Sequence, residues 1–580
     1  MERKELFVTD LLKAFNPKEN ISTRGDKTMW CSVPYETLEY KGNLLASPAG
    51  QYPGDICYDP QLNGWYKIYV AFPGFPPSIL NIKLSSDITY VYIHNHDGDP
   101  FGIEEVLWRC ADLTNESISI SKTNTTPNNM ALAWLRFVPM SEDEVAAYKA
   151  DNERTDTKRI YATEDMGNGI WDNEKCSVDD WRAVVSHMKD SDVEWFSPEF
   201  YNEDFGYSCN FMKYDRYEAI VDEAHKTGIK VAVSNRMGLW GAGYPYHYYG
   251  CGIRFVDEHP EFHCIDRNGE MVNALSYAYP EVRRLKIQDF VAAAKCGADA
   301  VMPLGHRGVP YVLFEKPVAD AFYEKYGEYP YELPLDEPRL RALHCDIMVQ
   351  YFRELREALD NEFGKDKIQI HLRCYNSIED SAYIGFDVYK LAEEGLIDAV
   401  ATHTRKFFEF IPDEIRKDDD KSRIDLDKFN DYVNQEGVSV WLTWEDDCYS
   451  KTTNSYGDEV NPHNFAENVR QWKEFSDKFG IRVYHEMFHM CRTNEDIKKN
   501  IPILYENGGD GITLFNTCIL SHEPARWNLL RKVGHKDEFN DFELIPGGYR
   551  KVRVLKFSNV DFNRYKPIWG GYYRLNKLPI

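Results

Sequence analysis

The chain has 580 residues, and 94 Asp and Glu against 68 Lys and Arg give it a formal net charge of −26. Nucleic acids and anionic membranes are therefore excluded as expected partners, because both attract basic proteins. With 43% hydrophobic and 28% charged residues, the composition is that of a folded globular protein, and the length predicts two or three domains. Aromatic residues reach 14%, a surplus that suits small ligands held against ring faces.

Several sequence features favour a cytoplasmic location. No stretch approaches the roughly 20 apolar residues that span a bilayer. Residues 1–16 mix charged and apolar positions and lack the hydrophobic segment of a secretion signal. The 13 cysteines include no C-x-x-C pair, which favours reduced thiols over a disulfide framework.

Residues 1–155 are rich in short β-type runs that Pro, Gly, Asn and Asp separate. These runs lie at 64–72, 79–84, 88–94 and 130–138. Short strands between turn residues are typical of a β-sandwich. The charged stretch 151–158 is the expected linker to the next domain.

From 156 to 535, apolar strands alternate with amphipathic helices. Eight strands are expected, at 193–197, 229–234, 300–304, 368–372, 399–403, 438–444, 481–488 and 511–516. Many follow a helix that ends in glycine, such as Gly297 or Gly480, because glycine adopts the left-handed conformation that closes a helix. Buried strands joined by helical crossovers predict an α/β fold, a (β/α)8 TIM barrel. An open doubly wound sheet is the rival, but no G-x-G-x-x-G follows the early strands.

A ninth strand-like segment, 159–165, precedes a helix that begins with the capping box Ser177–Asp180. We interpret it as an entry strand; as the alternative, it is the first barrel strand and shifts the count by one. Residues 536–580 return to β texture, and we expect them to pack near the sandwich. The β-rich ends and the surplus aromatics would suit a homodimer.

A TIM barrel carries its reactive side chains just after the C-terminal ends of its strands. At those positions Glu445 and Glu486 are the two predicted catalytic carboxylates, and Glu199 is the substitute. Glycoside hydrolysis needs one carboxyl group to protonate the leaving oxygen and another to attack the sugar or activate water. The alternative is that one or both carboxylates form ion pairs with nearby arginines. The sequence does not say which carboxylate takes which role.

Aromatic and basic residues at the same strand ends predict the substrate contacts. The loop 238–249 spaces its rings with glycines, which suits stacking on a sugar face, although the rings would also suit the barrel rim or a subunit contact. The arginines match the bidentate geometry of a carboxylate, so an acidic sugar is one reading and balancing of the active-site carboxylates is the other. The predicted substrate-binding residues are Trp240, Arg236, His306, Arg307, Arg373, His403, Arg405, Trp444 and Tyr484.

The motif His485-Glu486-x-x-His489 matches the zinc-binding H-E-x-x-H. Zinc ligation by that motif needs a helix, on which residues four apart share one face. Here the motif continues an apolar strand, so we expect no metal at it. His94-Asn-His96-Asp97 is best explained as a hairpin turn. The chain also lacks G-x-S-x-G and G-x-x-x-x-G-K-[ST], and we expect no cofactor.

The order of several motifs resembles one bacterial family. These are Asp257-Glu-His-Pro-Glu-Phe262, Leu275-Ser-Tyr-Ala-Tyr-Pro-Glu-Val-Arg283, Gly297-Ala-Asp-Ala-Val301, Arg307-Gly-Val-Pro310, Glu315-Lys-Pro317, Tyr326-Gly327 and Asp336-Glu-Pro-Arg339. The segment 159–516 is similar to glycoside-hydrolase-like family 10, which implies a TIM barrel and sugar hydrolysis. That family usually has an acidic residue at the end of the strand where this chain has Met302-Pro-Leu-Gly-His-Arg307, so no catalytic residue is transferred from it. His306 is the residue that could act there instead.

The sequence therefore predicts a glycoside hydrolase that cleaves a glycan, acidic or neutral, with paired carboxylates. A metal-dependent lyase or isomerase acting on a sugar through His306, His403 and His485 is the second hypothesis. A non-catalytic carbohydrate-binding protein is the third. Metal analysis separates the first two, and replacement of the carboxylates separates the first from the third.

Overall fold

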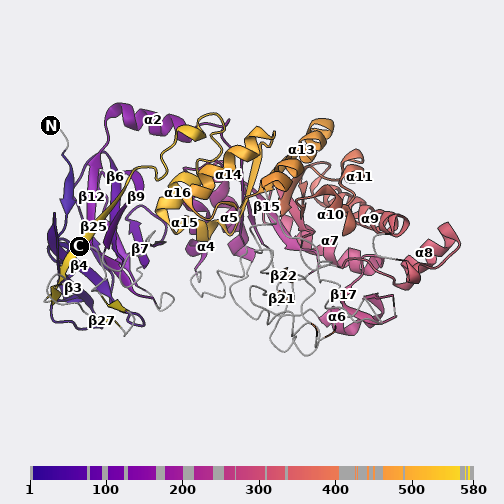
Figure 1. Cartoon of the computed structure of the whole chain (residues 1–580), viewed down its shortest axis with the longest axis horizontal. Coiled ribbons are helices and arrows are strands. Elements are labelled where there is room, and N and C mark those ends of the chain that lie inside the picture. The colour runs from indigo at the N-terminus through magenta and orange to yellow at the C-terminus, as the bar shows by residue number, and fades with distance from the viewer. Residues whose placement is uncertain are drawn as a thin grey trace.

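A computed structural model describes most of the chain. The described residues are 4–74, 79–94, 102–122, 128–164, 177–199, 214–238, 254–267, 269–306, 310–333, 337–403, 425, 428, 440–442, 448–450, 462–487, 490–558, 560–561, 568–569 and 573–574. A β-sheet domain occupies one end of the elongated molecule, and a barrel with its helices occupies the other (Figure 1).

Eight parallel strands close into the barrel. In order they are β13 (Ile160–Glu164), β14 (Val193–Pro198), β15 (Lys230–Arg236), β18 (Ala300–Leu304), β19 (Gln369–Tyr375), β20 (Ala399–His403), β23 (Arg482–Glu486) and β24 (Gly511–Phe515). The closing pair places β13 beside β24, with Ile160 opposite Ile512. The predicted TIM-barrel architecture is thus present, and it rests on this strand pairing.

One barrel strand differs from the prediction. The described part of the segment 438–444 is the short strand β21 (Val440–Leu442), which pairs antiparallel with β22 (Cys448–Ser450) in a separate hairpin. The barrel position goes instead to β13, the segment interpreted as an entry strand. All five residues of β13 are buried, as a strand covered on both faces requires.

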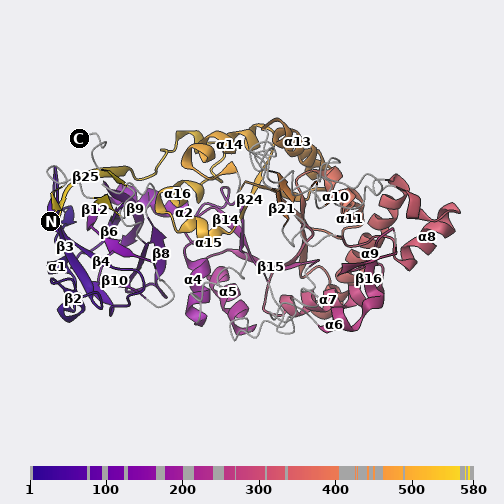
Figure 2. The same ribbon diagram turned by 60° about the horizontal axis from the view of Figure 1, so that its bottom comes forward.

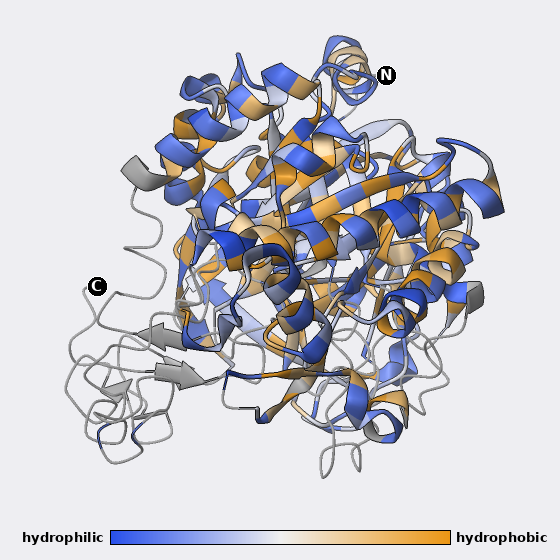
Figure 3. Cartoon of the chain, turned by 90° about the vertical axis from the view of Figure 1, so that its right-hand side faces the viewer, coloured by the Kyte–Doolittle hydropathy of each residue, from blue (hydrophilic) through white to orange (hydrophobic). Residues whose placement is uncertain are grey.

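Helices form the outer layer around the barrel (Figure 2). The layer includes α4 (Val178–Ser186), α5 (Tyr214–Lys226), α7 (Pro280–Ala294), α9 (Pro338–Phe363), α11 (Val388–Glu393), α13 (Pro462–Phe479), α14 (Asn494–Glu506) and α16 (Pro524–Leu530). Their ribbons alternate hydrophilic and hydrophobic residues (Figure 3), as expected of helices that bury one face. The predicted capping box opens α4, where the Ser177 hydroxyl accepts from the Asp180 N–H and the Asp180 carboxylate accepts from the Ser177 N–H.

Further elements lie in the connections between barrel strands. They are α6 (Arg254–Glu258), α8 (Lys316–Tyr326), α10 (Ile378–Tyr383), α15 (Thr517–Ser521), β16 (His263–Ile265) and β17 (Met271–Leu275). Gly297 and Gly480 have φ angles of 91° and 70°, the left-handed conformation predicted for helix ends before β18 and β23.

A layer of large side chains fills the barrel interior. Tyr161, Trp195, His371 and Tyr484 pack together, with ring centroids 4.4 Å apart for Trp195 and His371 and 5.0 Å apart for Tyr161 and Tyr484. Burial lowers the pKa of His371 to about 3, so this imidazole stays neutral. The barrel below its mouth is therefore a packed core.

The sheet domain contains β1 (Leu6–Val8) to β12 (Trp134–Pro139) and two strands from the C-terminal part of the chain, β25 (Tyr549–Phe557) and the short β26 (Val560–Asp561). The longest of its N-terminal strands are β3 (Trp30–Thr37), β4 (Lys41–Ser47), β6 (Trp65–Pro73) and β9 (Gly102–Asp112). The others are β2 (Ile21–Ser22), β5 (Ile56–Tyr58), β7 (Ile79–Leu84), β8 (Val91–His94), β10 (Ile118–Ser121) and β11 (Met130–Leu132). The short helix α1 (Leu11–Ala14) follows β1.

The C-terminal strand β25 (Tyr549–Phe557) links two parts of this sheet. Its first half pairs with β9 and its second half pairs with β3. The expected place for 536–580 was near the N-terminal strands, and β25 lies among them. The chain thus leaves the sheet domain for the barrel and returns to it.

The two parts of the molecule meet along one side of the barrel. Asn528 in α16 donates to the carbonyl of Leu107 in β9 at 2.7 Å. At the C-terminal end of the barrel, the N–H of His94 in β8 donates to the carbonyl of His522 at 2.8 Å. None of the described helices is both long and apolar enough to cross a bilayer.

Candidate active site at the barrel mouth

Side chains from six strands converge inside the C-terminal end of the barrel. Residues two apart on a strand share a face, so the inward packing of Trp195, Ala232, Ala401 and Tyr484 identifies the inward positions above them. Those positions carry Glu199, Arg236, Arg373, His403 and Glu486, and each of these side chains is buried. His306, after β18, is buried beside them.

Glu486, the last residue of β23, is paired with Arg373. The Nη2 of Arg373 donates to Oε2 of Glu486, and its Nη1 donates to Thr163 Oγ1 at 3.0 Å. The ring of Phe515 lies 5.5 Å from the guanidinium carbon. Both partners of the ion pair are 1% exposed. Arg373 therefore fixes the orientation of the Glu486 carboxyl group through a buried contact.

Glu199 forms a second buried pair on the neighbouring strands. Its Oε1 lies 2.7 Å from Nε of Arg236, with the two side chains 3% and 7% exposed. The N–H of Glu199 donates to the carbonyl of Glu164 at 3.0 Å, and Glu199 also forms an isolated bridge with Ser234. Backbone on both sides therefore fixes Glu199 at the end of β14.

His306 and His403 stack at the mouth. Their ring centroids are 4.1 Å apart and their planes differ by 18°. The ring of Phe515 lies 6.3 Å from that of His403, on the side of the Arg373–Glu486 pair. The two imidazole rings therefore lie face to face at the mouth, beside the Arg373–Glu486 pair.

The structure thus brings together six of the predicted site residues: Glu199, Glu486, Arg236, Arg373, His306 and His403. Glu445, Trp240, Arg307, Arg405 and Trp444 lie outside the described residues, as does His96. Their assignments remain predictions.

Tyr484 lies away from the mouth. Its hydroxyl donates to Oε2 of Glu194 at 2.9 Å, near the N-terminal end of β14, and its ring belongs to the interior layer. A strand residue two before Glu486 must face inward but one layer lower. Tyr484 therefore lies in the packed interior below the mouth and is not part of the candidate site.

The H-E-x-x-H segment runs as a strand through Glu486. His485 and Glu486 consequently face opposite sides of β23. His485 packs outward against Phe465 at 6.3 Å between ring centroids, and burial lowers its pKa to about 3. The helical zinc motif is not formed by these residues. Within the described ranges, no three His, Cys, Asp or Glu side chains are grouped to hold a metal ion.

Two residues that support the site were not predicted. Thr163 accepts from Arg373, and Phe515 contacts the guanidinium of Arg373. Thr163 was missed because β13 was not counted as a barrel strand. Phe515 was interpreted only as part of its strand, although it is the last residue of β24.

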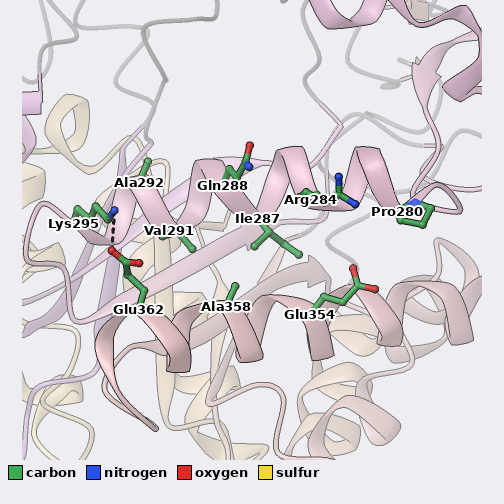
Figure 4. A pocket seen from close by; sticks show the side chains of 10 residues that line it. All are labelled: Pro280, Arg284, Ile287, Gln288, Val291, Ala292, Lys295, Glu354, Ala358 and Glu362. Atoms are coloured by element: carbon green, nitrogen blue, oxygen red, sulfur yellow. Dashed lines mark ion pairs between the residues drawn. The ribbon is translucent and has the colours of Figure 1, made fainter.

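A groove outside the barrel is separate from this mouth. It has a volume of about 610 Å³ and lies between α7 and α9. Figure 4 shows Ile287 and Val291 of α7 pointing toward Ala358 of α9, with Lys295 and Glu362 paired at one end. The Lys295–Glu362 distance is 2.8 Å.

The chain is distantly similar to several solved structures. No family model and no curated protein matches the chain. An α-L-fucosidase from Paenibacillus thiaminolyticus is 12% identical with a TM-score of 0.38, over 66% of this chain and 49% of that one. The β-amylase catalytic domain from Paenibacillus polymyxa is 10% identical with a TM-score of 0.38, over 66% of this chain and 98% of that one. An α-galactosidase from Thermus thermophilus is 11% identical with a TM-score of 0.35, over 87% of this chain and 94% of that one.

These likenesses are too distant to carry an argument about activity. This chain spans about half the length of the fucosidase, 49%. The resemblance to glycoside-hydrolase-like family 10 likewise stays a prediction.

Proposed function

We propose that the chain hydrolyses a glycosidic bond at the barrel mouth, with Glu486 as nucleophile or general base. The observation that supports this most strongly is the pair of buried, inward carboxylates, Glu486 and Glu199, at the C-terminal strand ends. Glycosidases require carboxyl groups that flank the scissile bond in such a mouth. Arg373 keeps Glu486 ionised and oriented, as either role demands.

The proton donor is a different group. Glu199 and Glu486 both contact guanidinium groups, so neither suits a role that needs a neutral carboxylic acid. We assign that role to Glu445. The hairpin formed by β21 and β22 lies between β20 and α13 in the chain, a connection that begins at the mouth. Residue 445 falls between its two strands.

The acidic-glycan hypothesis now depends on fewer arginines. Arg236 and Arg373 contact the protein's own carboxylates, which favours the alternative interpretation for those two. Recognition of a uronate would rest on Arg307 and Arg405. Uronides and neutral glycosides therefore both belong in the substrate panel.

Leaving-group dependence tests these roles. Wild type, E445Q and E486Q are assayed on matched 4-nitrophenyl and 2,4-dinitrophenyl glycosides. E445Q should lose turnover of the nitrophenyl substrate and retain the dinitrophenyl one, because the better leaving group needs no proton. E486Q should lose both. An equal loss of turnover by E445Q on the two substrates would contradict the role of Glu445 as acid. K295M, purified in the same way, is the control variant and should keep wild-type turnover on both substrates.

A metal-dependent lyase or isomerase acting on a sugar is the second candidate. The stacked imidazoles of His306 and His403 favour it, because neutral imidazole is a common metal ligand. Stoichiometric zinc or manganese in the purified protein, with activity that chelation removes and the metal restores, would select this candidate. A protein that binds sugars but turns over none of them would instead support the non-catalytic hypothesis.

A further inference from the structure

Lys286 lies behind the mouth with its side chain completely buried. It belongs to α7 and is 0% exposed. Its Nζ donates to Oδ1 of Asn235 at 2.9 Å and to the carbonyl of Arg236 at 3.2 Å, both at the end of β15. Asp289, one turn later in α7, lies 3.4 Å from the same Nζ. A buried ammonium is costly unless such partners surround it.

The two faces of α7 carry different residues. Ile287, Val291 and Lys295 point into the outer groove (Figure 4). Lys286 and Asp289 lie three residues apart on the buried face, which packs on β15. The helix thus delivers one positive charge to the mouth end of the barrel from outside the strand layer.

That charge is close to the Arg236–Glu199 pair. Lys286 holds the backbone oxygen of Arg236, while Nε of Arg236 contacts Glu199 at 2.7 Å. Burial lowers the pKa of Lys286, and the charges of Asp289 and Glu199 oppose that shift. A row of successive contacts therefore runs from α7 to the mouth, through Asp289, Lys286, Arg236 and Glu199.

We propose that Lys286 is a positioning residue of the active site: it fixes the end of β15, so that Arg236 holds Glu199 in place, and its charge favours ionised Glu199. The inference rests on the proposed function, in which Glu199 is one of the mouth carboxylates. Lys286 itself touches neither substrate nor reacting atoms.

Other titratable residues among the described ones also lie beside this row. Tyr277 and Tyr351 lie near Asp289. At the mouth, the hydroxyl of Tyr217 donates to the carbonyl of Glu199 at 3.0 Å, and the carbonyl of Glu164 accepts from the N–H of Glu199. Burial raises the pKa of Tyr277 and Tyr351 well above the usual value, so both stay neutral. The test therefore changes the charges of Lys286 and Asp289, which lie next to the Arg236–Glu199 pair.

The pH profile of kcat/KM tests the electrostatic part. Glu199 must be ionised to keep its contact with Arg236, so its protonation contributes to the acidic limb. K286M removes a positive charge near Glu199, so this limb should move to higher pH by roughly half a unit or more. D289N removes a negative charge, so its acidic limb should move to lower pH. We expect kcat of K286M to fall about 10- to 100-fold, since small misplacements are costly. A merely structural role would lower activity in both variants without moving the limbs in opposite directions.

The control is K295M, which breaks the exposed Lys295–Glu362 pair of the same helix. Its profile should match wild type. If K286M does not fold, D289N still tests the electrostatic part, because it retains Lys286 and the direction in which its acidic limb moves gives the answer. A K286M profile identical to wild type, or a D289N limb displaced to higher pH, would overturn the electrostatic part.

Crystal structures of wild type and K286M test the positioning part without turnover. The Arg236–Glu199 contact should be lost or displaced in K286M and kept in K295M. An unchanged contact in K286M would overturn the positioning role. Failure of the proposed function looks different: the wild type hydrolyses nothing, or E486Q keeps full activity, whatever K286M does to the contact.

Discussion

His535, between α16 and β25, contacts two carboxylates, one in the helix that precedes the barrel and one at the start of a barrel strand. Its Nε2 lies 2.7 Å from Oδ1 of Asp151 in α2 (Glu142–Asn152), and its Nδ1 lies 2.8 Å from Oδ2 of Asp192, just before β14. Contact with two carboxylates requires a proton on both ring nitrogens. Burial alone would lower the pKa of His535, but the hydrogen bonds to Asp151 and Asp192 outweigh it and raise the pKa from 6.5 to about 9.

This shift has a sign and an upper magnitude. A raised folded-state pKa stabilises the fold fully below pH 6.5, and the contribution is lost as pH rises through about 9. At 1.36 kcal/mol per unit, the shift corresponds to at most about 3 kcal/mol of unfolding free energy. The imidazole is 1% exposed, so solvent screening reduces this figure little.

Denaturant unfolding of wild type and H535Q at pH 6, 8 and 10 measures the contribution. The stability gap between them should shrink by up to about 3 kcal/mol from pH 6 to pH 10. H259Q is the matched control, because His259 contacts Glu261 at the surface, with side chains 36% and 58% exposed. A gap for H535Q that is the same at pH 6 and pH 10 would refute the reasoning.

Two further predictions concern close packing and a buried charge. In G305A the added Cβ would lie 2.5 Å from two ring atoms of Phe386, so we expect a loss of about 1–3 kcal/mol in stability and reduced turnover; wild-type melting behaviour would contradict this. In R136M, Glu105 would keep the indole N–H of Trp134 as a partner but lose its bidentate guanidinium. We expect a cost of about 3–5 kcal/mol in the sheet domain, seen by calorimetry as an earlier transition, and an unchanged thermogram would show that the pair contributes little.

Most of the barrel could be predicted because buried parallel strands are apolar on both faces. The exception is instructive. The segment 438–444 has the β-forming composition of a barrel strand, yet its described part pairs locally with β22. Strand composition does not reveal the partner, and pairing within a hairpin competes with pairing across the barrel. The segment 159–165 was recognised as strand-like, and the alternative interpretation, that it is the first barrel strand, agrees with the position of β13.

The sheet domain was harder to predict where charges are buried. β9 contains Glu104 and Glu105 in its interior, both at most 1% exposed. Such residues break the apolar pattern from which a strand is recognised. Arg136 and Trp134 supply the partners of Glu105 from β12, and that pairing is visible only in three dimensions.

For the site, the strand-end rule identified Glu199, Glu486, Arg236 and Arg373. It could not say which arginine contacts which carboxylate, because that depends on strand order and inward layering. The strand-end rule could not identify Lys286, because Lys286 lies on a helix. A lysine on the buried face of a helix that packs on a barrel strand is the signal that would have revealed it.

Turnover by E486Q tests the central claim most directly. The assay compares kcat/KM of wild type and E486Q on the best aryl glycoside of the panel, with sugar binding and near-ultraviolet circular dichroism as folding controls. We predict a loss of about 10²- to 10⁴-fold with binding retained. Hydrolysis at the wild-type rate by correctly folded E486Q would contradict the account.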